Sequence, residues 1–439
     1  MDFCIGVHLI SPALVSIRPG KSGRCDKVIA GGNVPSRLVI LDFTPIDQLG
    51  GHSYEYDRNV VTAFLARGWE CVVYAHHACR LKFVGGAEIR PLFTYLTTDT
   101  IVRAKLLRPF AKLFVHATRT VKEIRYAVLA EDTPDTVFFA QTVEPYHVWA
   151  LYRALSKPLC GKLVIMLRAT SLRTVRGNPR PTFRTAIYWF GLRRIRRLGA
   201  QVVLVADSEL LREEYQALTA IPINLVPHPN PTPLETTKRG HNASLCITAV
   251  GRLAVDKGSQ YLPQIMAIVH RKSLSARFAI HIHTDSPKAS QVYAPLQASI
   301  RANARTEDVL FETPLGAEDY WRQLEAADVV LLLYHPSRYR NQISGVLVDA
   351  LAAGCFPIVS DDTWLAHVVR SIGFGAVVRL DSNLSESVAA ILKTGIPKSI
   401  PEKVRDFLRF HTRENFFAVL TSVLQSNSNV ASSHIGSLH

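Results

Sequence analysis

A regular alternation of short apolar runs with longer segments of helical periodicity constrains the fold of this chain more than any other feature. The runs are rich in Val, Ile, Leu and Phe, and each has the length of one buried strand. They lie at residues 37–43, 71–75, 135–141, 162–167, 201–207, 245–250, 277–284, 308–313, 328–334, 356–360 and 376–380. Strands that alternate with amphipathic helices predict an α/β protein with mostly parallel, doubly wound sheets.

One segment interrupts the alternation and divides the chain. The stretch VPHPNPTPLETTKRGHNA, residues 226–243, is crowded with prolines and polar residues, which is typical of a linker. We therefore predict two Rossmann-like domains in series. In chain order the predicted segments are an N-terminal extension (1–36), an N-terminal Rossmann-like domain (37–227), the linker (228–243), a C-terminal Rossmann-like domain (244–395), a C-terminal helical segment (396–425) and a disordered tail with few apolar residues (426–439).

The charge balance favours an acidic partner. With 51 Lys and Arg against 36 Asp and Glu, the formal net charge is +15, which suits a nucleotide, a nucleic acid or an anionic membrane. No nucleic-acid recognition module accompanies this charge, so we expect no nucleic-acid partner. The seven cysteines are scattered without CxxC spacing, which is typical of neither a disulfide framework nor a zinc site. We expect a cytoplasmic protein.

Two segments favour a peripheral position on the inner face of a membrane, although each is equally typical of a core-facing helix with a solvated basic face. No apolar run reaches the roughly 18 to 20 residues of a membrane-spanning helix. In the first segment, an apolar stripe of helical spacing (Leu106, Phe110, Leu113, Ala117, Val121, Ile124 and Val128) lies opposite basic residues (Arg108, Lys112, Arg119 and Lys122). In the second, arginines (Arg193, Arg194, Arg196 and Arg197) adjoin aromatic residues (Tyr188, Trp189 and Phe190).

The segment AVGRLAVDKG, residues 249–258, is the strongest candidate for a binding site, and we call it the cation turn. It follows a predicted strand and precedes a predicted helix, and ligands of open α/β sheets bind at the carboxyl ends of the strands. Arg252 and Lys257 place two cations here, and an arginine fork with a compact ammonium suits a diphosphate better than a single carboxylate. The alternative is an ordinary ion-paired surface turn. We favour a phosphate or diphosphate site.

A second turn, DQLGGHS at residues 47–53, follows the first predicted strand. Gly50 and Gly51 would let the backbone approach a ligand closely, although a double glycine is often only a tight turn. This turn has the same place in the first domain that the cation turn has in the second. We therefore expect the two turns to face each other across a cleft.

A third candidate follows the predicted strand 328–334. A polar loop leads into a predicted helix that begins near Ser344 and Gly345 and carries Asp349 one turn inside. Asp349 is either a solvated helix residue or a carboxylate that accepts hydrogen bonds from the vicinal hydroxyls of a ribose.

Polar residues near the ends of strands in the first domain are candidates for the acceptor side. Glu144 and His147 follow the strand 135–141, and Arg168 follows the strand 162–167. Glu144 or His147 could hold or deprotonate an acceptor hydroxyl. Plain surface positions are the commoner alternative for such residues.

Four segments together resemble the retaining nucleotide-sugar glycosyltransferases of family four. DQLGGHSYEYDRNVVTAFLARGWECVVYA, LVADSELLREEYQALTAIPINLVPHPNP, AVGRLAVDKGSQYL and SGVLVDALAAGCFPIVS occur in the order and spacing of that family, and the likeness spans residues 37–425. The resemblance implies the GT-B fold, with two Rossmann-like domains and the sugar in the cleft between them. It also implies that Gly50 and Gly51 approach the donor diphosphate and that Arg252 and Lys257 neutralise it.

One pattern of the family is changed in this chain. The family carries two glutamates separated by seven residues, the first contacting the donor sugar and the second the ribose, and here Asn341 and Asp349 stand in their places. The resemblance therefore implies a ribose contact of shorter reach at Asp349, and sugar contacts from Asn341, Ser344 and backbone amides beside Gly345. Many members also have a histidine where Arg168 stands.

The resulting expectation is a retaining, metal-independent glycosyltransferase that moves a sugar from a nucleotide diphosphate sugar to a glycan or lipid-linked acceptor. Cell-surface polysaccharide or glycolipid synthesis is the expected setting, and no cofactor is expected beyond the nucleotide sugar as co-substrate. Retention is implied by the resemblance. Two alternatives stay open: a sugar phosphorylase on the same fold, and a non-catalytic GT-B protein that binds nucleotide or glycan, which the changed pair Asn341 and Asp349 would suit.

Overall fold

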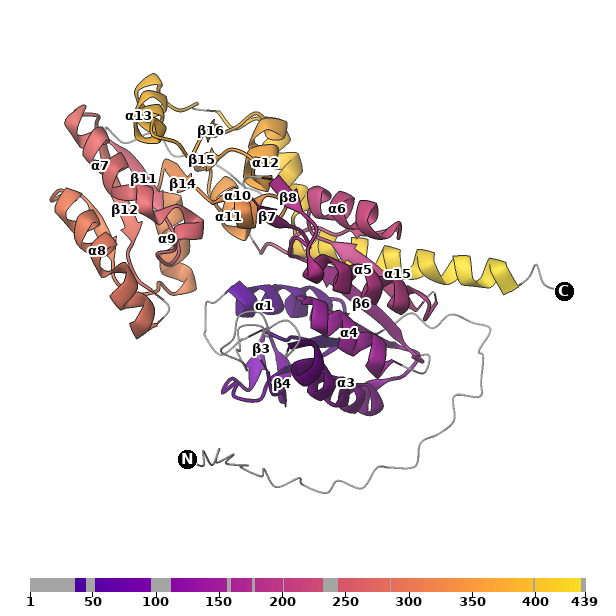
Figure 1. Cartoon of the computed structure of the whole chain (residues 1–439). Helices are drawn as coiled ribbons and strands as arrows, with labels where there is room; N and C mark the ends of the chain where they lie inside the picture. Colours follow the sequence, from indigo (N-terminus) through magenta and orange to yellow (C-terminus); the bar gives the residue numbers. More distant parts are fainter. Residues whose placement is uncertain are drawn as a thin grey trace, which may run out of the picture. The chain divides into compact units, whose positions relative to one another are not determined.

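Two sheets of mostly parallel strands organise the protein, as the computed structural model shows (Figure 1). The structure describes residues 36–44, 52–95, 112–155, 159–175, 178–199, 201–231, 244–284, 286–397 and 399–435. Both sheets belong to one compact unit, Pro35–His439. Gly50 and Gly51 lie outside the described residues, as does the predicted extension up to residue 35.

The first sheet has eight strands among the described residues, in the order β10-β9-β6-β5-β1-β2-β4-β3. Neighbouring strands are parallel except β3 and β4, which are antiparallel. The strands are β1 (Arg37–Leu41), β2 (Glu70–His76), β3 (Phe83–Val84), β4 (Ala87–Phe93), β5 (Thr136–Ala140), β6 (Lys162–Leu167), β9 (Val202–Ala206) and β10 (Asn224–Leu225). A separate hairpin joins β7 (Arg173–Val175) to β8 (Asn178–Arg180).

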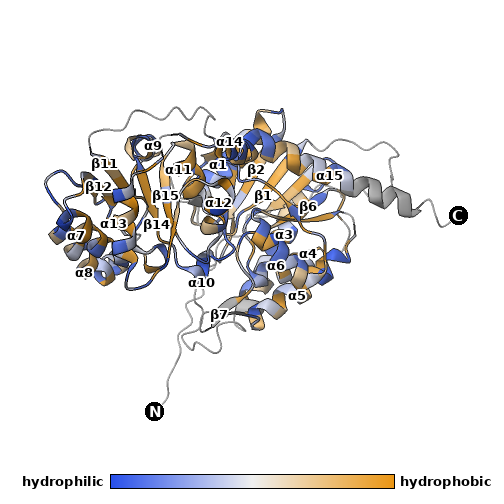
Figure 2. Ribbon diagram, turned by 90° about the horizontal axis from the view of Figure 1, so that it is seen from above, coloured by the Kyte–Doolittle hydropathy of each residue, from blue (hydrophilic) through white to orange (hydrophobic). Residues whose placement is uncertain are grey.

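Both faces of the first sheet are buried. Along β1, Val39 and Leu41 enter one core cluster, while Leu38 and Ile40 enter another, as the two-residue period of a strand requires. The helices before the second sheet are α1 (His52–Leu65), the π-helix η1 (Lys112–His116), α3 (Ala117–Glu131), α4 (Pro145–Ala154), α5 (Phe183–Arg196) and α6 (Glu209–Thr219). Figure 2 shows hydrophobic strands flanked by helices of mixed hydropathy, which is the pattern of a sheet covered on both sides.

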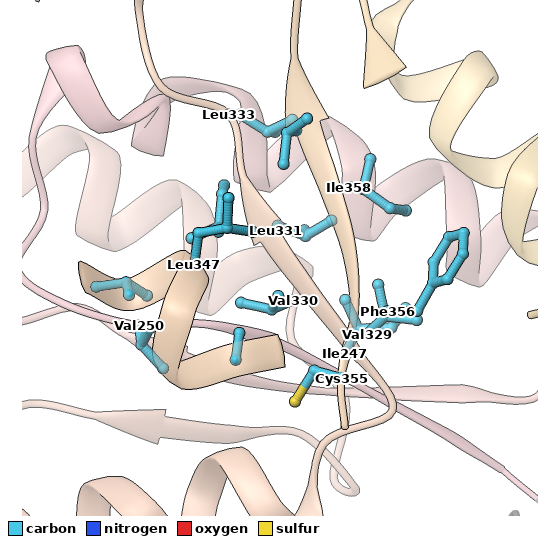
Figure 3. Close-up of a cluster of buried hydrophobic side chains, with 14 of the residues drawn as sticks. Ile247, Val250, Val329, Val330, Leu331, Leu333, Leu347, Cys355, Phe356 and Ile358 are labelled. Carbon is cyan, nitrogen blue, oxygen red and sulfur yellow. The ribbon is translucent and has the colours of Figure 1, made fainter. Parts of the chain in front are cut away.

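The second sheet is parallel throughout its described strands, in the order β13-β12-β11-β14-β15-β16. These strands are β11 (Leu245–Ala249), β12 (Ala276–His281), β13 (Val309–Phe311), β14 (Val329–Leu332), β15 (Phe356–Ser360) and β16 (Ala376–Val378). Its helices are η2 (Val255–Lys257), η3 (Ser259–Tyr261), α7 (Leu262–Arg271), α8 (Pro287–Asn303), α9 (Ala317–Ala326), α10 (Pro336–Tyr339), α11 (Gly345–Ala352), α12 (Trp364–Ile372), α13 (Leu384–Thr394) and α14 (Glu402–Phe410). Figure 3 shows Ile247, Val330 and Leu347 in the core that joins this sheet to α11.

The last helix, α15 (Arg413–Ile435), returns to the first sheet. Phe416, Leu420 and Leu424 are at most 1% exposed and belong to the same core cluster as Leu38 and Ile40 of β1. The helix continues to Ile435, past residue 426 where the predicted tail begins, and the disorder of that tail stays a prediction. Each residue added to an existing helix gains a backbone hydrogen bond, and continuation therefore does not require apolar residues.

The strands predicted from the sequence are confirmed, and the differences lie elsewhere. The prediction missed β3, β4 and the hairpin of β7 and β8; in β4 the proline Pro91 weakens the strand pattern. The described start of the predicted linker is packed, because Asn230 forms a bridge with Thr412 and the backbone N–H of His228 donates to Nδ1 of His411 at 2.9 Å. These partners lie far away in the sequence, so local composition did not indicate them.

Candidate functional site

A pocket lies at the carboxyl ends of β11 and β14. From β11 the chain continues to β12 on one side and later returns to β14 on the other, so the order of strands reverses here. Open α/β sheets bind their ligands at such a switch point. The cation turn lines the pocket with Gly251, Arg252 and Lys257, and His281 and Tyr334 line it from β12 and from the end of β14. The structure thus brings the two predicted cations to one pocket.

Two glycines determine the path of the cation turn. Gly251 has a φ of 91° and Gly258 has a φ of 76°, both in the left-handed region that favours glycine. A Cβ on Gly258 would lie 2.2 Å from the backbone oxygen of Leu333. Only glycine therefore allows the turn to pack directly against the chain that follows β14.

The two cations lie in different surroundings. The Nζ of Lys257 lies 5.9 Å from the ring centroid of Tyr334 and 2.9 Å from the position that a Cβ of Gly251 would occupy. The ammonium therefore uses the space left by the missing side chain. Burial raises the pKa of Tyr339, and the charge of Arg252 acts against that rise. A guanidinium and an ammonium at one pocket can bind a diphosphate.

Ser344 and Gly345 begin α11, as predicted from the sequence. Ser344 is the N-cap residue, and its Oγ accepts a hydrogen bond from the backbone N–H of Leu347 at 3.3 Å. A Cβ on Gly345 would lie 3.2 Å from Nε2 of His228. The structure therefore gives Ser344 a capping role and shows that Gly345 makes room for an imidazole, while donor contacts of both residues stay a prediction.

Asp349 is already hydrogen-bonded within the protein. Its Oδ1 accepts from Nδ2 of Asn230 at 2.8 Å, and its Oδ2 accepts from the hydroxyl of Tyr320 at 3.0 Å. Burial raises the pKa of Asp349 to about 7, although these two hydrogen bonds lower it. A ribose that binds here would share the Asp349 carboxylate with these two donors or replace one of them.

Asn341 has a carboxylate partner that the sequence-based prediction missed. Its Nδ2 donates to Oε2 of Glu214 at 2.6 Å, and its backbone oxygen accepts from Oγ of Ser208 at 2.6 Å. The same Glu214 carboxylate accepts from the hydroxyls of Thr170 and Ser171 at 2.7 Å each. Glu214 lies in the charged stretch ELLREEY, where it has the pattern of a solvated helix residue, so no local signal marked it.

Glu144 and His147 have structural roles at the start of α4. Glu144 is the N-cap residue, its backbone N–H donates to Nδ1 of His147 at 3.0 Å, and the two residues form a capping box. The carboxylate of Glu144 pairs with Arg184 at 3.0 Å. His147 is 1% exposed and stacks on Phe43 with ring centroids 4.1 Å apart. An acceptor-side role for either residue stays a prediction.

Arg168 lies among three buried carboxyl groups that the prediction also missed, namely Asp42, Asp57 and Asp207. Its Nε donates to Oδ2 of Asp207 at 3.1 Å, and its guanidinium carbon lies 4.0 Å from the ring centroid of Tyr56. Asp42 directly follows β1 and Asp207 directly follows β9, whereas Asp57 lies in α1. All three are at most 1% exposed. Asp42 and Asp207 could have been found as polar residues at predicted strand ends.

Burial raises the pKa of each of these carboxyl groups. The pKa of Asp57 lies well above its ordinary value because of burial and because of the neighbouring charge and hydrogen bond of Asp42. The pKa of Asp207 rises to about 6 through burial, although Arg168 lowers it. Asp57 also accepts a hydrogen bond from the amide of Gln141. Arg168 is thus a cation within a buried acidic cluster.

Two expectations cannot be placed in this geometry. Gly50 and Gly51 lie outside the described residues, so their approach to a donor stays a prediction. Within the described parts of the chain, no three His, Cys, Asp or Glu side chains are grouped so that they could hold a metal ion. Metal independence also stays an expectation.

Comparison with known proteins gives matches in structure. No family model and no curated protein matches the sequence. A glycosyltransferase from Rickettsia africae aligns over 92% of this chain and 99% of its own, with a TM-score of 0.61 and 11% identity. The trehalose-6-phosphate synthase OtsA aligns over 89% and 99%, with a TM-score of 0.61 and 13% identity. A sucrose-phosphate synthase from Thermosynechococcus elongatus aligns over 91% and 99%, with a TM-score of 0.56 and 14% identity.

At these identities the likeness shows the fold. The predicted fold class, α/β of the GT-B type with two Rossmann-like parallel sheets, is confirmed.

Proposed function

We propose that the protein is a glycosyltransferase that moves a sugar from a nucleotide diphosphate sugar to a hydroxyl acceptor. One observation carries this proposal: Arg252 and Lys257 line a single pocket at the switch point of the second sheet. The fold is in keeping with it, since the structurally similar proteins include a glycosyltransferase and two sugar-phosphate synthases. We also propose a relation to family four, which rests on the resemblance of the four sequence segments.

In this proposal the two cations act on the leaving group. When the bond between the sugar and the diphosphate oxygen breaks, negative charge grows on the diphosphate, and Arg252 and Lys257 stabilise it. The departing diphosphate oxygen then accepts the proton of the acceptor hydroxyl, whose oxygen forms the new bond to the sugar on the same face. Retention of configuration is part of the proposal and rests on the family resemblance. Asp349 holds the ribose by exchanging Asn230 or Tyr320 for the sugar hydroxyls.

The proposed acceptor is a glycan or lipid-linked sugar at the inner face of a membrane, in cell-surface polysaccharide or glycolipid synthesis. The surface of α5 supports this location, because Trp189 and Phe190 are 39% and 36% exposed. The guanidinium carbons of Arg193 and Arg194 lie 4.8 Å from these two rings. Aromatic rings paired with arginines suit an anionic lipid surface. Among the described residues, no helix has the length and apolar content needed to cross a bilayer.

The predicted apolar stripe of the other membrane segment faces the protein core. The described residues of that stripe lie against the interior, since Ala117 and Ile124 belong to a core cluster with Val121 and Val128 packed against it, whereas Phe114, Tyr126 and Leu129 of the same segment are exposed. Leu106, Arg108 and Phe110 lie outside the described residues. The predicted stripe is therefore the core-facing side of α3, and membrane contact by this segment stays a prediction.

A thermal-shift screen of common nucleoside diphosphates tests the donor site. A ligand at about 100 times its dissociation constant adds roughly 2.7 kcal/mol to the free energy of unfolding, so a donor nucleotide is expected to raise the melting temperature. No shift with any common nucleotide would contradict the proposal. Donor hydrolysis without acceptor separates an enzyme from a non-catalytic binding protein, and product formation that requires inorganic phosphate would indicate a phosphorylase.

A further inference from the structure

A chain of buried hydrogen bonds connects the cation turn to α9. Nδ1 of His281 lies 3.2 Å from the backbone nitrogen of Gly251, and Nε2 of His281 lies 2.6 Å from Oε1 of Gln323. Nε2 of Gln323 donates to Oγ1 of Thr248 at 2.6 Å and to the backbone oxygen of Ala279 at 3.1 Å. Thr248, His281 and Gln323 are 0%, 4% and 8% exposed. His281 therefore contacts the cation turn through Nδ1 and is held through Nε2 by the neutral amide of Gln323.

The groups at the two ends of this series of hydrogen bonds, the Gly251 N–H and the Ala279 oxygen, allow only one arrangement of protons. The backbone oxygen of Ala279 only accepts, so the amide nitrogen of Gln323 faces it and the amide oxygen faces His281. Nε2 of His281 must then carry a proton. The backbone N–H of Gly251 only donates, so Nδ1 of His281 must be unprotonated. The geometry thus requires a neutral imidazole with its proton on Nε2.

The surroundings of His281 favour the same state. Burial lowers the pKa of His281 to about 4, although the hydrogen bond that Nε2–H donates to Gln323 acts in the opposite direction. The charged or titratable groups that act on the ring are Lys257 of the cation turn and His283 beyond β12, and both lower the pKa further. The ring of Phe311 packs against the imidazole with centroids 5.2 Å apart. A second backbone contact, from the N–H of Leu253 to the oxygen of His283 at 2.9 Å, holds the turn next to the same strand.

We propose that His281 is a positioning residue for the diphosphate site: its neutral imidazole holds the amide of Gly251 and thereby the turn that carries Arg252 and Lys257. Protonation of Nδ1 places two N–H groups against each other and releases Gly251 from its left-handed conformation. The cation turn then loses its fixed position, and binding at the pocket weakens. The proposal rests on the proposed function only for the identity of the ligand, a nucleoside diphosphate.

Three variants separate hydrogen bonding, size and protonation. In His281→Asn, Oδ1 takes the place of Nδ1 as acceptor and the side chain does not titrate. His281→Leu removes the acceptor of the partly buried Gly251 N–H. Gln323→Glu places a carboxylate against Nε2 and so raises the pKa of His281. His367→Leu, at an exposed position of α12, is the control for loss of a histidine.

Calorimetric titration with the nucleoside diphosphate that binds the parent gives the first readout. At about pH 8, His281→Leu is expected to weaken binding about tenfold, because the partly buried N–H of Gly251 loses the acceptor that holds the turn, whereas His281→Asn restores binding to within about threefold. Gln323→Glu is expected to bind normally at about pH 8.5 and about tenfold more weakly at about pH 6, relative to the parent at each pH. Equal binding by His281→Leu and parent, or the same pH profile for Gln323→Glu and parent, would overturn the proposal.

Imidazole nitrogen NMR of the ligand-free protein gives a readout that does not depend on the proposed function. The signal of His281, assigned by its absence in His281→Asn, is expected to show the Nε2–H tautomer from about pH 8 down to about pH 5. An imidazolium already present at about pH 6 would exclude the positioning role. If no nucleoside diphosphate binds the parent while this signal behaves as expected, the proposed function fails and the hydrogen-bond chain stands. Thermal unfolding of each variant identifies any variant that fails to fold. If Gln323→Glu fails to fold, the comparison of His281→Asn with His281→Leu tests the proposal alone.

Discussion

The two sheets place opposite chemistry at the same point of their topology. In the second sheet the switch point between β11 and β14 ends in a pocket with Arg252 and Lys257. In the first sheet the equivalent point lies between β1 and β5, where the residues that follow these strands, Asp42 and Gln141, meet Asp57 of α1.

The difference shows that strand order determines where a site lies, whereas the residue types at that point determine its charge. Strand order determines where polar groups collect, because the carboxyl ends of adjacent parallel strands meet at one edge. In the second sheet that edge carries two cations above a neutral imidazole, which suits an anion. In the first sheet the cation Arg168 pairs with Asp207, and the nearby carboxyl group of Asp57 has a raised pKa, so side chains of the protein itself occupy this edge.

Removal of the cations in the second sheet is expected to have the largest effect. Arg252→Ala and Lys257→Ala should each lower turnover a hundredfold or more, because loss of a group that stabilises developing charge costs about 3 to 4 kcal/mol. Steady-state transfer assays check this, with circular dichroism to confirm folding. Lys288→Ala, at an exposed position of α8, is the matched control. If the double variant folds well and has near-parent activity, the two cations of the second sheet have no catalytic role, and this difference between the two sheet edges is contradicted.

Removal of the cation in the first sheet should instead affect stability. Arg168→Leu leaves Asp207 buried without its partner, which is expected to lower the free energy of unfolding by about 3 kcal/mol at pH 8. The folded-state pKa of Asp207 is already raised to about 6, so the stability associated with this group is fully present below about pH 4 and is lost as the pH rises through about 6. The variant should therefore differ less from the parent at about pH 5.

Denaturant unfolding at both pH values measures this difference. Arg194→Leu, which removes an arginine stacked on Phe190 at the surface, is the control. An equal loss of stability at both pH values would mean that Arg168 acts through packing and not through the charge of Asp207.

Asp349→Asn should change binding and stability in opposite directions. If Asp349 accepts hydrogen bonds from ribose hydroxyls, the variant should weaken nucleoside diphosphate binding by about 1.5 to 3 kcal/mol. Asparagine can still accept from Asn230 and donate to the Tyr320 hydroxyl, and it has no charge to desolvate. The raised pKa of Asp349, about 7, means that the parent loses stability as the pH rises from about 4 through 7. The variant should thus be more stable than the parent at pH 8 and gain nothing at pH 4.

A thermodynamic cycle with a 2′-deoxynucleotide tests the ribose contact directly. The deoxynucleotide should lose energy with the parent and little more with Asp349→Asn, because both changes remove one shared contact. Asp349→Glu, with its longer reach, should retain measurable binding. Calorimetric titrations complete the cycle, and strictly additive losses would show that Asp349 does not touch the ribose.

The smallest effect per residue concerns the exposed side of α5, which is basic although the strand ends of the first sheet are acidic. We expect the protein to sediment partly with anionic liposomes and to be released by salt, because the Debye length falls from about 10 Å at 0.1 M to about 3 Å at 1 M. Glutamine at positions Arg193, Arg194, Arg196 and Arg197 should release it too, at about 1 kcal/mol per arginine. Glutamine at the ion-paired arginines of the other sheet, Arg301, Arg322, Arg370 and Arg379, is the control of equal charge. Equal sedimentation of both variants would mean that the arginines of α5 form an ordinary solvated face and do not bind the membrane.

The sequence predicted the features that depend on neighbours in the chain. The cation turn was recognisable because its glycines, its cations, the strand before it and the helix after it all lie close together. The acidic cluster was not, since Asp57 and Gln141 are separated by 84 positions and Arg168 and Asp207 by 39. Glu214 and Asn341 are separated by 127 positions, and nothing near either one indicates the other. In β4, Pro91 is tolerated because β3 pairs only with Ala87 and Glu88 of that strand.

The position of α15 has a consequence for how the protein is made. Phe416, Leu420 and Leu424 complete a core that begins with Leu38, yet a ribosome produces them only after the whole second sheet. During synthesis, one apolar face of the first sheet is therefore covered by α1 but not yet by α15, while the second sheet already has all of its strands. Such a surface is open to chaperones and to aggregation. Chains that end before residue 416 should thus misfold in the first sheet, which lies at the other end of the sequence from the truncation.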